Sequence, residues 1–227
     1  MYKCTCIIPI YNEDERILKV LDEILNIKSI NEIICINDGS TDNTLELIKN
    51  YYPTIKLVSY SKNLGKTGAV RKGIQVSTGN FILLLDGDLQ NFNYQEIENG
   101  IINIYKNTLT DMIIFRRFNA SWNIKLLRGD ILVSGERILR KKDLKKIINI
   151  QKPEGYQLEF AINKYMMVNN KSVYWMPSSA LNTWPTTKFG FIKGMLKIIK
   201  MNMNILIYLG FANYIKQLLF FSRKKLV

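Results

Sequence analysis

Short apolar runs alternate with amphipathic segments through the first half of the chain, and this pattern constrains the fold most strongly. Runs of strand length lie at residues 3–8, 32–37, 55–59, 80–85 and 111–115, and segments with helical spacing lie at residues 13–26, 41–50, 68–76 and 94–105. Strands that alternate with helices form parallel sheets with right-handed crossovers. The expected fold class is therefore α/β, with a mostly parallel, Rossmann-like sheet flanked by helices.

Beyond Phe115 this alternation becomes irregular. Residues 116–130 are expected to form a loop or a short helix, residues 155–167 a helix, residues 172–176 a strand and residues 177–185 a polar link. From Thr187 the chain becomes basic and apolar. We therefore expect one α/β domain over residues 1–186 and a basic, amphipathic helical appendage over residues 187–227.

The appendage has the composition of helices that lie on a membrane surface. Apolar residues at helical spacing are flanked by lysines from Phe191 to Lys200, and the 19 residues 203–221 are apolar apart from one lysine and three side-chain amides. A spanning helix needs about 20 apolar residues with few charges. We expect an interfacial amphipathic helix, with Arg223–Lys225 reaching anionic headgroups. A helix packed on the domain's own core is the alternative.

Composition excludes several classes of chemistry. The chain has no histidine, so Ser-His-Asp hydrolysis and the usual catalytic zinc sites are excluded, and carboxylates must do the acid, base and metal work. Its three cysteines lie in apolar runs without zinc spacing, as buried reduced thiols do. The apolar run Cys4–Ile10 is too short for a signal peptide, and we expect the protein on the cytoplasmic side of the membrane.

The net charge of +13 lies mostly after residue 99 and calls for an acidic partner: nucleic acid, anionic lipid or a phosphorylated substrate. The sequence contains no recognisable nucleic-acid-binding module, so nucleic acid is not the expected partner. It makes no prediction about the oligomeric state.

Polar residues follow three of the predicted strands. They lie at residues 9–13, 37–42 and 86–90. Ligands of open α/β sheets bind beyond the carboxyl ends of the strands. Parallel packing therefore brings these three segments to one edge of the sheet, where we expect the functional site.

Asp86 and Asp88 are two carboxylates that point to the same side of an extended backbone, and Gly87 between them allows a turn and close approach of a ligand. Like charges this close repel unless a cation lies between them. Oxygen ligands suit Mg²⁺ or Mn²⁺, and Gln90 offers a further oxygen. The alternative is an ordinary Asp-Gly surface turn.

Asp38 and Lys66 each have two interpretations. Asp38 can accept hydrogen bonds from a base or ribose, while Ser40 or Thr41 caps the following helix. Gly65-Lys66-Thr67 resembles part of a phosphate-binding loop, but Tyr60 stands where that motif needs its first glycine. Lys66 is therefore either a phosphate ligand or a solvated loop lysine.

Four motifs in order resemble the family-2 glycosyltransferases of the GT-A fold. They are CTCIIPIYNEDERI, INDGSTDNT, KNLGKTGAVRKGI and FILLLDGDLQ, which together run from Cys4 to Gln90. DGDLQ is similar to the D-A-D-L-Q motif of dolichol-phosphate mannose synthases. The Q-x-x-R-W motif of processive synthases is absent, so the resemblance implies a non-processive enzyme, with inversion of the sugar.

The resemblance also implies roles for individual residues. It places Pro9, Tyr11, Glu13, Asp38, Lys66, Asp86 and Gly87 at the nucleotide-sugar, and Asp86, Asp88 and Gln90 at the metal. Arg116 or Arg117 would meet the donor and acceptor phosphates; because neighbours on a strand point oppositely, one is expected to face the site and the other solvent. No obvious catalytic base is present, and the nearest candidates are Glu136, Glu154 and Glu159.

The expected activity is glycosyl transfer from a UDP- or GDP-sugar, with Mg²⁺ or Mn²⁺ stabilising the leaving diphosphate. A polyprenyl phosphate in the membrane is the preferred acceptor, because a phosphate anion needs no base. A soluble sugar or a phosphorylated small molecule is the alternative acceptor. A catalytically inactive protein that binds nucleotide-sugars is the alternative from another class.

Overall fold

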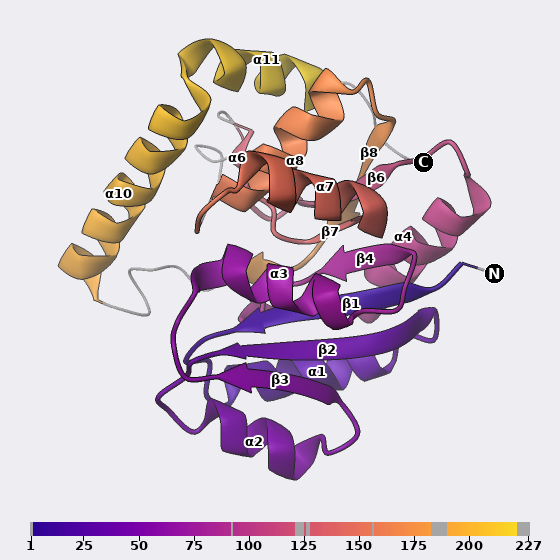
Figure 1. The fold of residues 1–227 in the computed structure, drawn as a ribbon, viewed down its shortest axis with the longest axis vertical. Helices are drawn as coiled ribbons and strands as arrows, with labels where there is room; N and C mark the ends of the chain where they lie inside the picture. The colour runs from indigo at the N-terminus through magenta and orange to yellow at the C-terminus, as the bar shows by residue number, and fades with distance from the viewer. Residues whose placement is uncertain are drawn as a thin grey trace.

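The computed structural model describes residues 2–91, 93–120, 125, 128–155, 157–182 and 190–221. Its centre is a seven-stranded sheet of order β3-β2-β1-β4-β7-β6-β8, with helices on both faces (Figure 1). These strands are β1 (Cys4–Ile10), β2 (Ile30–Asp38), β3 (Lys56–Tyr60), β4 (Phe81–Leu84), β6 (Met112–Arg117), β7 (Arg137–Arg140) and β8 (Val173–Ser178). The predicted α/β fold with a mostly parallel sheet is confirmed.

Strand β7 is antiparallel to both of its neighbours, β4 and β6, while β1, β2, β3 and β4 pair in parallel and so do β6 and β8. The carboxyl ends of β4 and β6 therefore lie at the same sheet edge as the beginning of β7. A short ribbon of β5 (Leu89–Gln90) and β9 (Leu181–Asn182) lies apart from the main sheet.

Two hydrophobic cores cover the two faces of the sheet. One face packs against α1 (Arg16–Leu25), α2 (Thr44–Tyr51) and α4 (Tyr94–Lys106). The other packs against α3 (Gly65–Val76), α6 (Gly129–Leu132), α7 (Lys141–Gln151) and α8 (Gln157–Val168). Along β4, Phe81 and Leu83 enter the first core and Ile82 and Leu84 the second. This strand is buried on both faces, as its apolar sequence predicts.

The sequence pattern gives no strand or helix between residues 131 and 154, whereas the structure has β7 and α7 there. A strand of four residues is too short to show a period of two. Helix α7 does carry Leu144, Ile147 and Ile148 at helical spacing, a pattern that would have found it. The predicted loop from residue 116 also begins too early, because β6 continues to Arg117 by pairing with β8.

The C-terminal segment forms two helices, α10 (Phe191–Leu209) and α11 (Phe211–Phe221), which meet at Gly210 (φ 70°) with a bend of 94°. Both wrap around α8 (Figure 1), and Ile205, Leu209 and Phe221 join its core. Within the described residues no single helix is long and apolar enough to cross a membrane, although α10 and α11 together have the length and composition of a broken span. Arg223–Lys225 and Lys188 lie outside the described residues.

Candidate active site

The turns that follow β1 and β2 are joined to each other. The Asn12 N–H donates to Ser40 Oγ (3.0 Å), the Thr41 N–H donates to Asn12 Oδ1 (2.8 Å), and the Glu13 N–H donates to Thr44 Oγ1 (2.9 Å). The predicted N-cap at Ser40 or Thr41 is therefore wrong: α2 begins at Thr44, and both hydroxyl residues link the two turns instead. Since β1 also pairs with β4, the three polar strand ends lie at one sheet edge.

Asp38 is the last residue of β2 and only 3% exposed. Its Oδ1 accepts from the Leu64 N–H (2.8 Å), and its backbone oxygen accepts from Asn63 Nδ2 (3.1 Å). Burial, together with this carboxylate, raises the pKa of the Tyr60 hydroxyl. Asp38 thus shapes the loop that leads into α3, in addition to any contact it makes with a ligand.

Lys66 on α3 bridges two carboxylates. Its Nζ lies 2.5 Å from Asp86 Oδ1 and 2.7 Å from Glu159 Oε1. Burial lowers the pKa of this ammonium, but the two carboxylates outweigh burial and raise the pKa above its ordinary value. The side chain is 23% exposed, so Lys66 is an ion-paired residue of the site and not a solvated loop lysine.

Two glycines flank Asp86 differently. A Cβ on Gly87 would lie 3.4 Å from Pro9 O, an ordinary contact, and Gly87 does not adopt a positive φ. The expectation that this turn depends on Gly87 is therefore wrong. A Cβ on Gly135 would lie 2.5 Å from Asp86 Oδ2 and 2.8 Å from Lys66 Nζ, so the chain at Gly135 packs directly against the ion pair.

Arg117 lies on the site side of β6. Its Nη2 is 3.1 Å from Glu136 Oε2, and Ser134 Oγ donates to the same carboxylate oxygen (2.9 Å). Burial lowers the pKa of the guanidinium, but Glu136, Asp86 and Asp88 outweigh it and raise the pKa. The negative field of both strand-end carboxylates therefore reaches Arg117.

Arg116 points to the opposite face of the sheet. Its Nε lies 2.5 Å from Asp130 Oδ2, and its guanidinium lies over the Trp175 ring, 4.7 Å from the centroid. The two arginine side chains are 22% and 18% exposed. The expectation that one of them faces solvent is therefore wrong, although they do point oppositely.

The remaining predicted residues lie around the same edge. Tyr11 is 46% exposed, Glu13 is buried and pairs with Arg16 Nε (3.0 Å), and Pro9 lies within β1. Gln90 is exposed on the β5–β9 ribbon, opposite Leu181. Glu154 precedes α8, and its N–H donates to Gln157 Oε1. Sequence reasoning missed Gly135 and Arg137, which neighbour Glu136 and gave no separate pattern.

The donor atoms at this edge fit a divalent cation shared with a substrate. The described residues contain no group of three or more His, Cys, Asp or Glu side chains arranged to hold a metal. Asp86 Oδ1 already contacts Lys66, which leaves few protein oxygens for an ion. Carboxylate and amide oxygens suit Mg²⁺ or Mn²⁺, and Mg²⁺ is commonly held by one or two carboxylates plus substrate phosphates.

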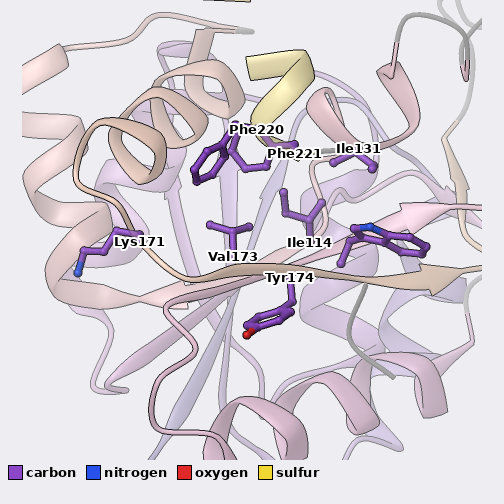
Figure 2. Close-up of a pocket in the computed structure, with 8 residues that line it drawn as sticks. Ile114, Ile131, Lys171, Val173, Tyr174, Phe220 and Phe221 are labelled. Atoms are coloured by element: carbon purple, nitrogen blue, oxygen red, sulfur yellow. The ribbon is translucent and has the colours of Figure 1, made fainter. Parts of the chain in front are cut away.

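A cavity of about 220 Å³ lies away from these carboxylates, between β8 and α11 (Figure 2). Ile114 and Val173 point from the sheet toward Phe220 and Phe221 of α11, while Tyr174 points to the other face of the sheet. Ile131, Lys171 and Trp175 complete its lining. The side chains directed into the cavity are therefore mainly apolar.

The fold is that of the GT-A glycosyltransferases. Glucosyl-3-phosphoglycerate synthase from Mycobacterium tuberculosis, solved with Mn²⁺, UDP and phosphoglyceric acid, matches with a TM-score of 0.71 at 15% identity over 94% of this chain and 78% of that one. The same protein has also been solved with Mg²⁺ and UDP, at a TM-score of 0.69.

The family model of glycosyl transferase family 2 matches residues 5–173, and the chain belongs to this family. Dolichyl-phosphate beta-glucosyltransferase ALG5C of Trichomonas vaginalis is 42% identical over 96 residues, 37% of this chain and 28% of that protein. Dolichyl-phosphate beta-glucosyltransferase of Dictyostelium discoideum is 35% identical over 121 residues, 45% of this chain and 36% of that protein. The chain thus spans about a third of the length of these curated relatives.

Proposed function

We propose that the chain transfers a sugar from a UDP- or GDP-sugar to a polyprenyl phosphate, without processivity and with inversion. The observation that carries this proposal is the Asp86/Asp88 pair at the end of β4, with Lys66 and Arg117 beside it, in a family-2 domain. Two acidic and two basic groups at one sheet edge match a nucleoside diphosphate held together with a cation.

The donor occupies this edge. Asp38 binds the nucleoside, with Pro9, Tyr11 and Glu13 bordering it, and Asp86, Gly87 and Lys66 lie along the diphosphate. Asp88, Asp86 and Gln90 would hold Mg²⁺ or Mn²⁺, which when bound neutralises charge on the leaving diphosphate. Arg117 stabilises the same developing charge from the end of β6.

The two expected bases are already committed to cations. Glu136 pairs with Arg117, and Glu159 pairs with Lys66. A neighbouring cation favours the ionised form of a carboxylate and weakens it as a proton acceptor. We therefore assign both glutamates to holding these cations. A phosphate acceptor fits such a site, because its oxygen attacks the anomeric carbon without losing a proton while the bond to the diphosphate breaks.

Two observations support a lipid as the carrier of that phosphate. The similar proteins from T. vaginalis and D. discoideum are named for dolichyl phosphate. The apolar cavity beneath α11 lies beside Trp175, which contacts Arg116 at the end of β6 (Figure 2). A soluble phosphorylated acceptor is the second candidate, favoured by the fold shared with glucosyl-3-phosphoglycerate synthase.

The outer faces of α10 and α11 support a position on an anionic membrane surface. Their exposed large apolar residues are Phe191, Ile192, Met195, Leu196, Ile199, Met203, Leu206, Ile207, Phe211, Ile215 and Leu219. Lys193 and Lys200 lie exposed on α10, and residues 187–227 contain no Asp or Glu. An exposed apolar face with a basic flank is typical of interfacial helices. This placement would be peripheral, on the cytoplasmic leaflet.

Turnover assays test the proposal. UDP- and GDP-sugars with Mn²⁺ are incubated with polyprenyl phosphate, 3-phosphoglycerate or a free sugar, and Asp88→Asn serves as the matched variant. We expect glycolipid formation that Asp88→Asn reduces by about 100-fold or more. Transfer only to 3-phosphoglycerate would favour the soluble acceptor. Nucleotide-sugar binding without transfer to any acceptor would favour an inactive binding protein.

A further inference from the structure

Arg137 is a fully buried arginine beneath the candidate site, at 0% exposure the largest of the fully buried side chains. It is the first residue of β7. Because β7 is antiparallel to β4 and β6, its first residue lies at the same sheet edge as Asp86 and Arg117. The exceptional direction of this one strand thus brings Arg137 to the site.

The hydrogen bonds of Arg137 join two segments. Its Nε and Nη2 donate to Ser134 O, and its Nη1 donates to Asn163 Oδ1 (3.0 Å) and to Glu159 O (3.3 Å). These acceptors are neutral oxygen atoms. Burial lowers the pKa of the guanidinium, and the more distant charges of Glu159, Glu136 and Asp86 oppose that effect. A buried charge held in this way is costly compared with an apolar side chain of similar volume.

Both segments border Asp86. Ser134 O precedes Gly135, whose backbone packs against the Asp86 carboxylate and Lys66 Nζ. Glu159 lies in the first turn of α8, where its side chain holds Lys66 at 2.7 Å. Asn163, one turn later, also donates to Leu132 O (3.1 Å) and so ties α8 to the segment that leads into β7.

We propose that Arg137 is a positioning residue for glycosyl transfer: it holds the Ser134–Gly135 backbone and the first turn of α8, and through Gly135, Glu159 and Lys66 it sets where Asp86 meets the donor diphosphate. The inference rests on the proposed function of this site. Arg137 itself touches no substrate. Positional errors of about 1 Å in such supporting groups reduce turnover by up to about 100-fold.

A double-mutant cycle tests this connection. Arg137→Lys, Glu159→Gln and the double variant are compared by kcat, donor KM and Tm. If Arg137 acts through Glu159, each single change lowers kcat by about tenfold and the double variant falls little further, because residues that share one network are not additive. Uridine or guanosine affinity stays unchanged, since the nucleoside lies at Asp38. Additive losses, or a folded Arg137→Lys with parental kcat, would overturn the proposal.

Arg140→Met is the matched control, because Arg140 lies at the other end of β7 and donates to Asp111 Oδ1 (3.2 Å) and Thr108 O (2.8 Å). It should lower Tm and leave kcat unchanged. If Arg137→Lys does not fold, Asn163→Ala replaces it, with the same expected loss of kcat and the same contradicting result. If the parent turns over no donor, the proposed function fails. Calorimetric UDP and GDP affinity with Mn²⁺ then decides this inference, and equal affinity in parent and variant overturns it.

Discussion

At the scale of single residues, space around a Cβ separates two glycines that look alike in the sequence. Gly87→Ala should keep parental Tm and kcat, since its Cβ would meet Pro9 O at 3.4 Å. Gly135→Ala should lower kcat by about tenfold or more, because its Cβ would displace Asp86 and Lys66. Steady-state kinetics and thermal melts of both variants check this. An inactive Gly87→Ala, or an unaffected Gly135→Ala, would contradict the described packing.

Asp38 combines a structural and a proposed binding role, and two substitutions separate them. Asp38→Asn keeps an oxygen for the Leu64 N–H but loses the charge, so Tm should change little while the donor Kd rises roughly tenfold. Asp38→Ala should weaken donor binding similarly and also destabilise the fold by about 1–3 kcal/mol, because a buried N–H loses its acceptor. Calorimetry and thermal melts measure both effects. Unchanged donor affinity in both variants would leave Asp38 with the structural role alone.

At the scale of elements, the end of β6 directs two adjacent arginines to opposite faces of the sheet. Arg117→Met should reduce kcat/KM for the donor by about 100-fold, since the charge nearest the diphosphate is lost. Arg116→Met should mainly raise the KM for the phosphate acceptor, because Arg116 lies beside Trp175 and the cavity. Kinetics with each substrate varied in turn distinguish the two. Equal effects on donor and acceptor would contradict this division.

Helices α10 and α11 each have an inner and an outer face, so deletion of 203–227 would remove core residues Ile205, Leu209 and Phe221 together with the surface. Point changes on the outer face test membrane binding more cleanly. Phe191→Ser combined with Ile207→Ser should keep Tm within about 2 °C, as exposed sites usually do. We expect co-sedimentation with anionic liposomes to fall several-fold.

The matched control changes two exposed residues elsewhere, Leu109→Ser with Ile150→Ser, at 80% and 73% exposure. This variant should bind liposomes like the parent. Equal binding by all three proteins, or no binding by the parent, would place the membrane contact elsewhere or remove it.

At the scale of the whole molecule, folding and metal dependence should be separable. Two hydrophobic cores stabilise the domain, and the described residues hold no arrangement of three metal ligands. Excess EDTA should therefore abolish turnover and leave Tm unchanged, and Mn²⁺ should restore activity. Differential scanning calorimetry beside the turnover assay measures both. Full activity in EDTA would remove the metal from the proposed mechanism, and a lower Tm would indicate a structural ion.

The sequence by itself determined the features that depend on local pattern. The apolar period gave the strands from β1 to β4, and parallel pairing then placed Asp38, Asp86 and Asp88 at one edge, because chain direction alone decides where strand ends lie. The family follows from motifs in that same region. These inferences need only neighbours in the chain and one rule of sheet topology.

Tertiary structure alone decided which distant groups meet. Glu159 reaches Lys66 across 93 positions, and the antiparallel insertion of β7 brings Gly135 and Arg137 to Asp86. The partners of Arg116 and Arg117, and the split of α10 and α11 into core and surface, also depend on packing. Periodicity reports which face of an element is buried, whereas an ion pair depends on which elements pack together, and that choice is made by the whole chain.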